Sequence, residues 1–589
     1  MENRIFMLGK SIWLCMFCFL LVGCSFFEGA VKEAPKEREL ENDFNFATIE
    51  QPQGISKELE ENLFYLGKIW GFLKYYHPNV AEGEFNWDQE LFYILPEILS
   101  ATSSLERDAV LVEWIESLGE IKGEKSTSPE DGEEKIKMEP DLDWLNSSGF
   151  SEELEGVLQT VKNSERNDLH HYVSLAEGVG NPVFQNELEY RHPYPETEYR
   201  LLSLYKYWNI IEYYFPYKYL IDEDWDDVMK EFIPKLIHAK NEQEYHLNTL
   251  ELIARVHDTH ANIWNPSSVI ERYWGKRYHP AILTFVEGKP VVTGYYKEEE
   301  GKSSGLEVGD VITKIDGKTI DEILETQLKY IPASNYETQL RDMALKLLRT
   351  NEKSLSVEIE RNGELKSLEL AVFTKNNLEV DQYDIFHNGT EPFQLLDSNS
   401  VAYMYMGDFS YSFLNDYQSE LDQTKGMIID FRSYPSEFTV FSLGEYLLPD
   451  SREFVKFTNG SIEHPGLFTM TDPLTVGEEN NEHYKGKIVI LINEVTQSSA
   501  EYHAMAFRTA ENATVIGSTT AAADGNMSFF TLPGGIETAI TGIGVYYPDG
   551  TETQRVGIIP DIYMTPTIEG IKEGRDELLE KAIEIINEQ

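Results

Sequence analysis

The chain has 589 residues and a mass of 67.7 kDa, which is too long for one compact domain and corresponds to about four domains of roughly 150 residues. Hydrophobic residues make up 41% and aromatic residues 12%, which is enough for ordinary cores and excludes wholesale disorder. The 102 Asp and Glu against 50 Lys and Arg give a formal charge of −52, a surface that repels phosphate backbones and excludes nucleic acid as an expected partner.

Residues 1–23 have the pattern of a signal peptide, with two basic residues before an apolar run at 12–22. The run is too short for an ordinary transmembrane helix. The following Leu-Val-Gly-Cys resembles the lipobox of bacterial lipoproteins, in which the peptide is cut before the cysteine and the thiol is acylated. That resemblance implies a lipid on Cys24, and the alternative is a plain signal peptide with a chance cysteine. All three cysteines lie in the first 24 residues, so the rest of the chain has no thiol for a disulfide or a metal site.

Residues 24–56 are polar and acidic with scattered prolines, as expected of a tether between a lipid anchor and a folded body. No later stretch is apolar enough to span a membrane. The sequence therefore predicts a protein anchored to the lipid bilayer through Cys24, with its folded part on the extracytoplasmic face of the cell membrane.

Residues 57–122 and 198–275 are expected to be two related helical modules, joined by a polar connector at 123–197. The sequence LGKIWGFLKYYHP at 66–78 is echoed by LYKYWNIIEYYFP at 204–216, at an offset of 138 positions. The same offset pairs one further tryptophan and one further proline in each copy. Apolar positions recur at helical spacing in both, so packing for stability accounts for most of these residues.

The two copies differ where they end. The second closes with Val-His-Asp-Thr-His at 256–260, which places His260 where the first copy has Lys122. Since the first copy manages with lysine, packing alone does not demand a histidine there, although a half-buried structural histidine is the alternative. His257 and His260 form a His-x-x-His pair, but no third ligand is evident, so neither a metal nor another cofactor is expected.

Residues 276–375 lose the helical period and are predicted to be rich in β-strands. The segment GLEVGDVITKIDGKTI at 305–320 resembles a PDZ domain of the circularly permuted bacterial type. Gly309 and Gly317 suit turn positions that need a positive φ. The resemblance implies capture of extended peptides, often C-termini, at a sheet edge, and the alternative is a purely structural β-sandwich.

Residues 376–589 alternate strands and helices, with strands expected at 401–406, 426–430, 487–492 and 514–517 and a helix at 499–510. That alternation predicts α/β layers around a mostly parallel sheet.

The segment INEVTQSSAE at 492–501 takes an apolar strand through a polar turn into a helix. A serine at such a helix start lies near free backbone N–H groups and the positive end of the helix dipole, conditions that suit a nucleophile which must stabilise an oxyanion. Ser498 is the candidate. The alternative is that Ser498 is an N-cap in a Ser-x-x-Glu capping box with Glu501.

Four segments occur in the order seen in the serine peptidase family of C-terminal processing peptidases and tricorn core proteases. They are the PDZ-like segment, IIDFRSYP at 428–435, the turn at 493–501 and VGIIPDI at 556–562. The chain resembles this family over roughly residues 200 to 570. The resemblance implies an α/β protein with a crotonase-like ββα catalytic domain, an inserted PDZ-like β domain and duplicated helical modules at its N-terminal side. It also implies a serine endopeptidase that acts on peptides or protein C-terminal regions.

The resemblance assigns roles residue by residue. Ser498 takes the nucleophile's position, and the N–H of Ser499 that of an oxyanion donor. One branch uses a lysine base about 25 residues later, but the aligned segment at 520–525 has none. The tricorn-like branch uses a histidine preceded by a hydroxyl residue, which Thr259 and His260 match.

Two positions depart from the family pattern. In the tricorn-like branch an acidic residue orients the hydroxyl and forms a Ser-His-Ser-Glu relay. Its position aligns with Gln554, while Glu552 is the better chemical candidate because a carboxylate can stabilise an imidazolium; both stay open. The usual Asn-Pro-Gly-Gly is replaced by Ser-Tyr-Pro-Ser-Glu at 433–437, and since proline has no N–H, Ser436 is the expected second donor. Asp430 and the nearby arginine are expected to form a structural ion pair.

The sequence thus predicts a membrane-anchored extracytoplasmic serine endopeptidase in which Ser498 attacks, His260 is the base, and Thr259 and Glu552 orient it. The alternative from another class is a catalytically silent peptide-binding lipoprotein that lost the relay at Gln554. The substrate's identity and the oligomeric state do not follow from the sequence.

Overall fold

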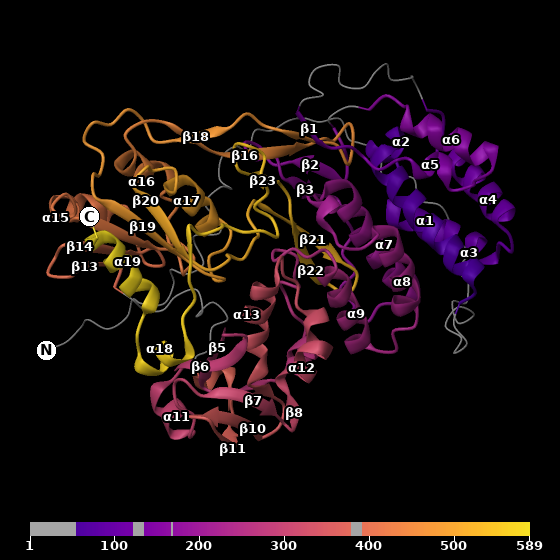
Figure 1. The fold of residues 1–589 in the computed structure, drawn as a ribbon. Coiled ribbons are helices and arrows are strands. Elements are labelled where there is room, and N and C mark those ends of the chain that lie inside the picture. Colours follow the sequence, from indigo (N-terminus) through magenta and orange to yellow (C-terminus); the bar gives the residue numbers. More distant parts are fainter. Residues whose placement is uncertain (1–54, 122–134, 167–168, 379–390, 589) are drawn as a thin grey trace, which may run out of the picture.

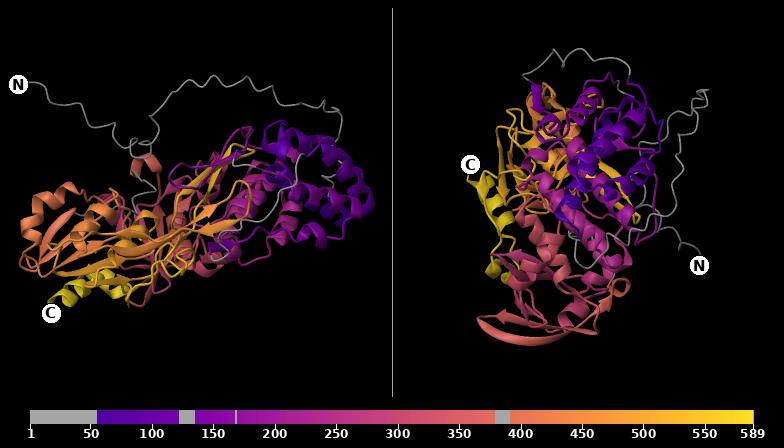
Figure 2. Two further views of the ribbon diagram at one scale, coloured as in Figure 1. Left: turned by 90° about the horizontal axis from the view of Figure 1, so that it is seen from above. Right: turned by 90° about the vertical axis from the view of Figure 1, so that its right-hand side faces the viewer.

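The computed structural model describes residues 55–121, 135–166, 169–378 and 391–588. Cys24 and Lys122 therefore lie outside the described residues, as do the expected signal peptide and most of the tether. Within the described part, no helix is long and apolar enough to cross a membrane. The helical modules lie at one end of an elongated molecule and the α/β domain at the other, while residues 276–375 project from the middle (Figure 1, Figure 2).

Each helical module is built from three main helices at equivalent positions in the sequence. They are α1 (Lys57–Tyr76), α3 (Trp87–Ser100) and α4 (Ser104–Ser117) in the first, and α7 (Thr197–Tyr214), α8 (Trp225–Ile237) and α9 (Glu242–Ala254) in the second. Helix α1 packs against both α7 and α8, and the two modules share one hydrophobic core. The short helices α2 (Pro78–Ala81) and α10 (Ser268–Trp274) complete this part of the chain.

A tryptophan pair joins the first two main helices of each module. The indole N–H groups of Trp70 and Trp87 each donate to the other residue's carbonyl, at 3.1 and 3.0 Å. Trp208 and Trp225 repeat the exchange at 2.7 and 3.1 Å. All four indoles are buried, so these bonds satisfy N–H groups that would otherwise be costly to bury.

Two equivalent ion pairs cross between the modules. Lys68 contacts Asp226 and Lys206 contacts Asp88, each at 2.8 Å, and 138 positions separate the two lysines as well as the two aspartates. Because each lysine reaches the other module's aspartate, the pairs fix how the two modules sit against each other.

The connector is more ordered than its polar composition suggested. It contains β1 (Ile136–Met138), α5 (Trp144–Ser147), α6 (Glu152–Lys162), β2 (Val173–Leu175) and β3 (Pro182–Phe184). Leu154, Leu158 and Val161 of α6 are fully buried in the helical core. Strand β1 pairs with β17 of the α/β domain, so the connector links the helical modules to that domain.

Residues 276–375 form an antiparallel six-stranded sheet in the order β11-β10-β7-β6-β5, with β8 paired to β7. Its elements are β5 (Ala281–Val286), β6 (Lys289–Tyr295), α11 (Glu298–Ser303), β7 (Val311–Ile315), β8 (Lys318–Thr319), α12 (Ile320–Gln327), α13 (Tyr336–Leu347), β10 (Ser354–Arg361) and β11 (Glu364–Ala371). Gly309 and Gly317 have φ of +94° and +80°, as predicted for these turn positions. A second small sheet of β4 (Arg277–Tyr278), β9 (Arg349–Thr350) and β12 (Phe373–Thr374) lies where the chain enters and leaves this module.

The C-terminal part is an α/β domain around a six-stranded sheet, which is parallel except for β13. The strand order is β13 (Phe393–Leu396), β14 (Val401–Tyr405), β15 (Gly426–Asp430), β19 (Lys487–Ile492), β20 (Ala513–Gly517) and β24 (Ile562–Tyr563). One face is covered by α15 (Ser412–Leu421), α16 (Val440–Leu447) and α17 (Ser499–Phe507), and the other by α19 (Glu577–Asn587). The mixed α/β prediction is therefore confirmed. The predicted ion pair of Asp430 with Arg432 is also present, at 2.6 Å.

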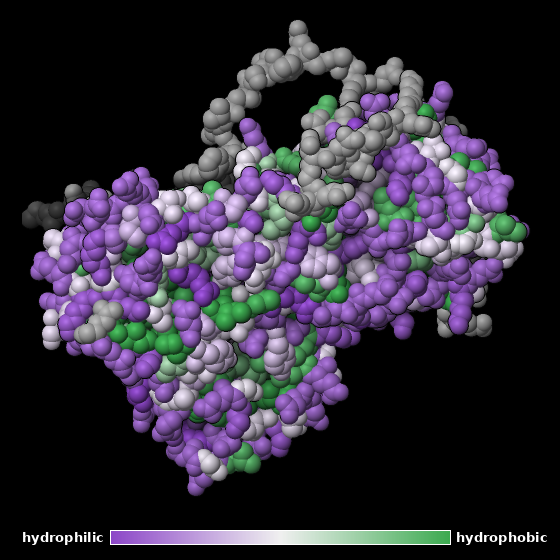
Figure 3. Space-filling view, turned by 45° about the horizontal axis from the view of Figure 1, so that its top comes forward, coloured by the Kyte–Doolittle hydropathy of each residue, from purple (hydrophilic) through white to green (hydrophobic). Residues whose placement is uncertain are grey.

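A second group of strands lies between this sheet and the helices. It contains β16 (Arg452–Gly460), β17 (Phe468–Met470), β18 (Leu474–Val476) and β23 (Val545–Tyr546). The hairpin of β21 (Met527–Leu532) and β22 (Ile536–Thr541) precedes β23 in the chain. Strand β21 packs on α7, so the hairpin joins the second helical module to the α/β domain (Figure 1). Helix α18 (Ile568–Glu573) packs on the 276–375 module. The surface is mainly hydrophilic, with hydrophobic residues gathered between that module and the α/β domain (Figure 3).

Candidate active site

Ser498 stands at the turn between β19 and α17 in a strained backbone conformation. Its φ is +53° and its ψ is −115°, a region that residues other than glycine rarely adopt. The Ser498 N–H donates to the carbonyl of Ala523 and to the carboxylate of Glu501, both at 3.0 Å. The N–H of Ser499, the first residue of α17, makes no hydrogen bond with any described residue. A strained serine beside a free N–H at a helix start is the arrangement of a nucleophile with an oxyanion donor.

Glu501 holds the nucleophile turn in place. Its buried carboxylate accepts hydrogen bonds from the Thr520 hydroxyl at 2.5 Å and from the N–H groups of Ser498, Ala522 and Ala523 at 3.0 to 3.1 Å. Burial raises the pKa of Glu501 to about 7, and the four hydrogen bonds oppose that rise. Glu501 therefore ties the Ser498 turn to the loop of residues 520–525.

His260 lies in the loop that follows α9 and is 2% exposed. Its Nδ1 is 2.8 Å from the Oγ1 of Thr541, at the end of β22. The Thr541 hydroxyl lies 2.9 Å from the Oδ1 of Asp258, and the Thr541 N–H donates to Oδ2 at 2.7 Å. Burial lowers the pKa of His260 below its ordinary value, and the negative charge of Asp258 opposes this. Burial therefore favours the neutral form of the ring, which is the form that the expected base needs.

Thr259 does not contact the ring that it was expected to orient. The Thr259 N–H donates to the Oγ of Ser334 at 3.0 Å, and the Ser334 N–H donates to the Oγ1 of Thr259 at 2.9 Å. Its hydroxyl also donates to the carbonyl of Ala521 at 3.2 Å. Thr259 therefore fastens the segment of His260 to the 520–525 loop and to the 276–375 module, which contains Ser334.

The two candidates for the fourth relay residue occupy different places. Gln554 is buried, and its amide nitrogen lies 3.3 Å from the Oδ1 of Asp258. Glu552 lies elsewhere, where its carboxylate accepts hydrogen bonds from Lys137 at 2.9 Å and from Tyr219 at 3.2 Å. The structure therefore brings Gln554 but not Glu552 to the histidine's surroundings, and the carboxylate found there is that of Asp258.

The expected second oxyanion donor is occupied. The N–H of Ser436 donates to the carbonyl of Met406 at 3.0 Å, so it is not free to bind an oxyanion. In the same segment, Tyr434 was not expected to take part. Its hydroxyl pKa is raised by burial and by the charge of Asp524, while a hydrogen bond with the Ser498 side chain opposes the rise. Tyr434 thus adjoins the nucleophile, in a stretch where the sequence departs from the family pattern.

Ser498 and the His260 segment meet the same loop from two sides. The Ser498 N–H contacts the carbonyl of Ala523, and Thr259 contacts that of Ala521. No hydrogen bond joins the Ser498 hydroxyl to His260 within the described part of the chain. Such bonds often tighten only in the complex with substrate. The 520–525 loop therefore contacts both the turn of Ser498 and the segment that contains His260.

Exposed aromatic side chains lie beside the nucleophile turn. Phe438 is 56% exposed and stacks on Tyr502 with ring centroids 5.9 Å apart. The Tyr502 N–H donates to the carbonyl of Ser498 at 3.0 Å, which places this ring one helical turn from the nucleophile. Phe441 and Tyr434 add further exposed aromatic surface. An apolar substrate side chain would find partners here.

The His-x-x-His pair does not converge on one point. His257 faces Asp222 at 3.5 Å, whereas His260 faces Thr541. Across the described ranges, no three His, Cys, Asp or Glu side chains are arranged to hold a metal ion.

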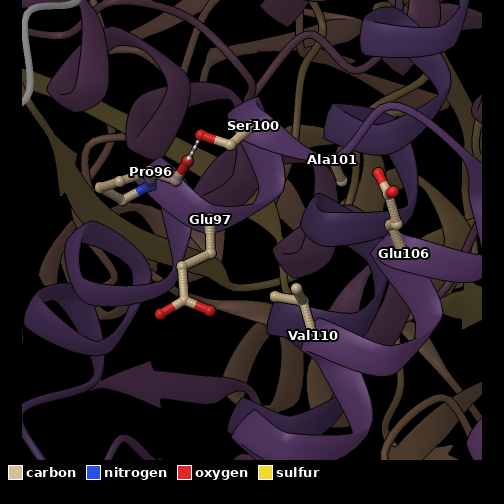
Figure 4. Close-up of a pocket in the computed structure, with 6 residues that line it drawn as sticks. All are labelled: Pro96, Glu97, Ser100, Ala101, Glu106 and Val110. Carbon is tan, nitrogen blue, oxygen red and sulfur yellow. Dashed lines mark hydrogen bonds between the residues drawn. The ribbon is translucent and has the colours of Figure 1, made fainter.

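A pocket of about 410 Å³ lies away from this site, between α3 and α4 of the first helical module (Figure 4). It is lined by Pro96, Glu97, Ser100, Ala101, Glu106 and Val110. The Ser100 hydroxyl donates to the Pro96 carbonyl at 2.9 Å, so part of its polar lining is already satisfied. The pocket contributes no residue to the Ser498 site.

Comparisons with known proteins find one family model and several solved structures that are similar to the chain. Residues 400–564 match the model of peptidase family S41. Mature CPAF complexed with lactacystin is similar in structure, with a TM-score of 0.51 and 15% identity over 67% of this chain and 99% of that one. Mature CPAF has a TM-score of 0.50 and 15% identity over 67% of this chain and 98% of that one. The photosystem II D1 C-terminal processing protease has a TM-score of 0.37 and 15% identity over 64% of this chain and 98% of that one. No curated protein sequence matches the chain.

The match to peptidase family S41 covers residues 400–564, and the chain is a serine peptidase.

Proposed function

We propose that the protein is a membrane-anchored serine endopeptidase that works on the extracytoplasmic face and cleaves peptides or protein C-terminal regions. The observation that carries the proposal is the strained Ser498 turn with its free Ser499 N–H, which shares the 520–525 loop as a contact with the segment of the buried His260. Ser498 attacks the scissile carbonyl, and His260 takes its proton and later gives it to the leaving amine. The Ser499 N–H stabilises the oxyanion.

A fluorophosphonate probe tests the nucleophile, because only an activated serine reacts readily with it. We expect the wild-type chain and the Ser499→Ala variant to be labelled, since alanine keeps the backbone N–H, and the Ser498→Ala variant to stay unlabelled. A folded wild-type chain that resists the probe and leaves casein intact would favour the alternative, an inactive peptide-binding lipoprotein on the same scaffold.

Residues 276–375 support the capture of a substrate tail in the manner of a PDZ domain. Strand β5 stands at the edge of the sheet, and α13 packs beside it, an arrangement in which an extended peptide can add as a further strand. Helix α13 also contacts the nucleophile turn, because Arg341 donates to the Glu494 carbonyl at 2.9 Å and to the Gln497 side chain at 3.0 Å. Deleting the module would therefore disturb the catalytic site as well.

A binding assay on the full chain avoids that problem. The Ser498→Ala variant, which cannot cleave, is titrated into a fluorescent peptide and into its C-terminal amide, and anisotropy is measured. We expect the free carboxylate to bind at least about tenfold more tightly, since recognition of a C-terminus needs its charge. Equal affinity for the two peptides would contradict capture of C-terminal tails.

The anchor has its own test, although Cys24 lies outside the described residues. We expect the Cys24→Ser variant to leave the membrane fraction while keeping its activity on a soluble peptide, because the thiol carries the lipid and the catalytic site is far along the chain. Unchanged partitioning into detergent would refute lipidation and leave the peptidase assignment untouched.

A further inference from the structure

The geometry points to a relay of Ser498, His260, Thr541 and Asp258, in which the Thr541 hydroxyl and the Asp258 carboxylate are positioning residues for the general base. The inference rests on the proposed role of His260 as that base. It replaces Thr259 and Glu552, which were expected to orient the ring, with two residues that the sequence did not single out for this task.

The hydrogen bonds fix the direction of the relay. The Oδ1 of Asp258 accepts hydrogen bonds from the Thr541 hydroxyl at 2.9 Å and from the backbone N–H of His260 at 3.1 Å. Its Oδ2 accepts from the backbone N–H of Thr541 at 2.7 Å. A carboxylate only accepts, so the single hydroxyl proton of Thr541 points to Asp258. The Thr541 oxygen must then accept a hydrogen bond from Nδ1–H of His260, 2.8 Å away. The ring is thereby held in the tautomer whose Nε2 carries a free lone pair.

The surroundings make this arrangement rigid. Asp258 is 0% exposed, Thr541 is 0% exposed and His260 is 2% exposed, so these bonds are shielded from bulk solvent. Thr541 is β-branched and stands at the end of β22, which restricts its side chain. A negative charge two hydrogen bonds from the ring stabilises the imidazolium that forms during the reaction.

The relay also explains why an amide stands at position 554. The Gln554 amide nitrogen lies 3.3 Å from Oδ1 of Asp258 and 3.3 Å from Oγ of Ser334. A glutamate there would set a second carboxylate against Asp258 in a buried site, and two like charges at that distance repel strongly. With Asp258 supplying the charge, an uncharged donor is the residue type that fits at 554.

The proton balance is simple. When Ser498 attacks, its O–H bond breaks, an O–C bond forms and the proton moves to Nε2 of His260. Nδ1–H stays on the ring and Thr541 keeps its own proton, so neither Thr541 nor Asp258 gains a proton. The proton on Nε2 then passes to the leaving amine as the C–N bond breaks.

The test compares Thr541→Val, Thr541→Ser and Asp258→Asn, with Thr538→Val as the matched control. Thr538 stands on the same strand, is 0% exposed, and its hydroxyl has no partner among the described residues. We expect Thr541→Val to lower kcat about 10²-fold with little change in KM, Thr541→Ser to restore most of it, and Thr538→Val to leave it unchanged. Since the charge of Asp258 raises the pKa of His260, Asp258→Asn should move the rise of kcat/KM to lower pH.

Two further variants separate the possible failures. Gln554→Glu should lower activity in this relay, whereas it should raise activity if position 554 were the true acid site. A gain in Gln554→Glu together with near-normal kcat in folded Thr541→Val would overturn the relay. If the His260→Ala and Ser498→Ala variants also cleave substrate at the normal rate, the proposed function itself is wrong. If those two variants are inactive while Thr541→Val has normal kcat, only the relay is wrong.

Discussion

The first helical module (α1, α3, α4) and the second (α7, α8, α9) share helix positions, tryptophan pairs and crossed ion pairs, but they differ beyond the third helix. After α9, the loop enters the α/β domain and brings Asp258 and His260 against β22. In the first copy, the described residues at 118–121 that come directly after α4 take no part in the Ser498 site. The helices therefore supply a similar frame in both copies, and the proposed chemistry depends on the loop that follows the second copy.

The strongest test of this contrast uses one buried histidine from each module. His77 follows α1, is 0% exposed and has no hydrogen-bond partner for its ring among the described residues. We expect His260→Ala to lower kcat/KM at least about 10³-fold. His77→Ala should leave kcat/KM nearly unchanged but lower the free energy of unfolding by about 2 kcal/mol or more, because it leaves a cavity. Cleavage kinetics on a quenched fluorescent peptide measure the first effect, and urea unfolding measures the second. Near-normal cleavage by a folded His260→Ala chain would show that His260 is not the base.

The crossed ion pairs provide the second test, since their burial differs. Lys206 and Asp88 are 3% and 5% exposed at their side chains, and Lys206 also contacts Glu187 at 2.9 Å. Asp226, the partner of Lys68, is 36% exposed. We expect Lys206→Met to cost about 3 to 5 kcal/mol, because it leaves the buried Asp88 carboxylate without a cation, and Lys68→Met about 1 kcal/mol. Tryptophan fluorescence in urea is a suitable measurement, because six of the nine tryptophans lie in the helical core. Equal losses would show that the two pairs do not differ as their burial implies.

The third test exchanges a residue between the copies. Phe215 stands in the second module where the first has His77. Burial lowers the pKa of His77 to about 4, so the unfolded chain binds more protons below the unfolded value of about 6.5, and the histidine destabilises the fold as pH falls through that range. His77→Phe should remove this penalty and make the chain about 2 kcal/mol less sensitive to a change from pH 7 to pH 5. An unchanged pH dependence of the urea midpoint would mean that His77 is not buried as a neutral ring.

The fold could be predicted where local patterns determine it. Strands at 426–430 and 487–492 were placed at their true bounds, because buried parallel strands are continuous apolar runs. The helix expected at 499–510 ends at Phe507 instead, since the end of a helix depends on local packing and capping rather than on periodicity. The helices and strands of the connector do not follow from its polar composition, because its few apolar residues gain their importance only when they pack on the other helices.

The relay could not be found from the sequence, for a physical reason. His260 and Thr541 are 281 residues apart, and only the packing of the β22 hairpin against the second module brings them together. Glu552 has the carboxylate that this role requires and Gln554 does not, but in the fold Glu552 pairs with Lys137. The signal that was present was Asp258, two residues before the expected base, and family order drew attention to the hydroxyl of Thr259 instead.

The smallest difference between the modules concerns how the second helix of each begins. Asn86 caps α3 with one long bond, from the Gln89 N–H at 3.4 Å, whereas Asp224 caps α8 by accepting from Asp226 and Asp227 at 2.9 and 3.2 Å. Asp224 also brings a negative charge to the positive end of the helix dipole. We expect Asp224→Ala to cost about 1 to 2 kcal/mol and Asn86→Ala about 0.5 kcal/mol, with kcat/KM unchanged in both.

Asn86→Asp is the matched control, because it gives the first module the capping residue of the second. It should raise the urea midpoint slightly if charge and bond geometry explain the difference between the caps. A loss in Asn86→Asp, or equal losses in the two alanine variants, would instead mean that packing around each helix start sets its stability, and that the likeness of the modules does not extend to their caps.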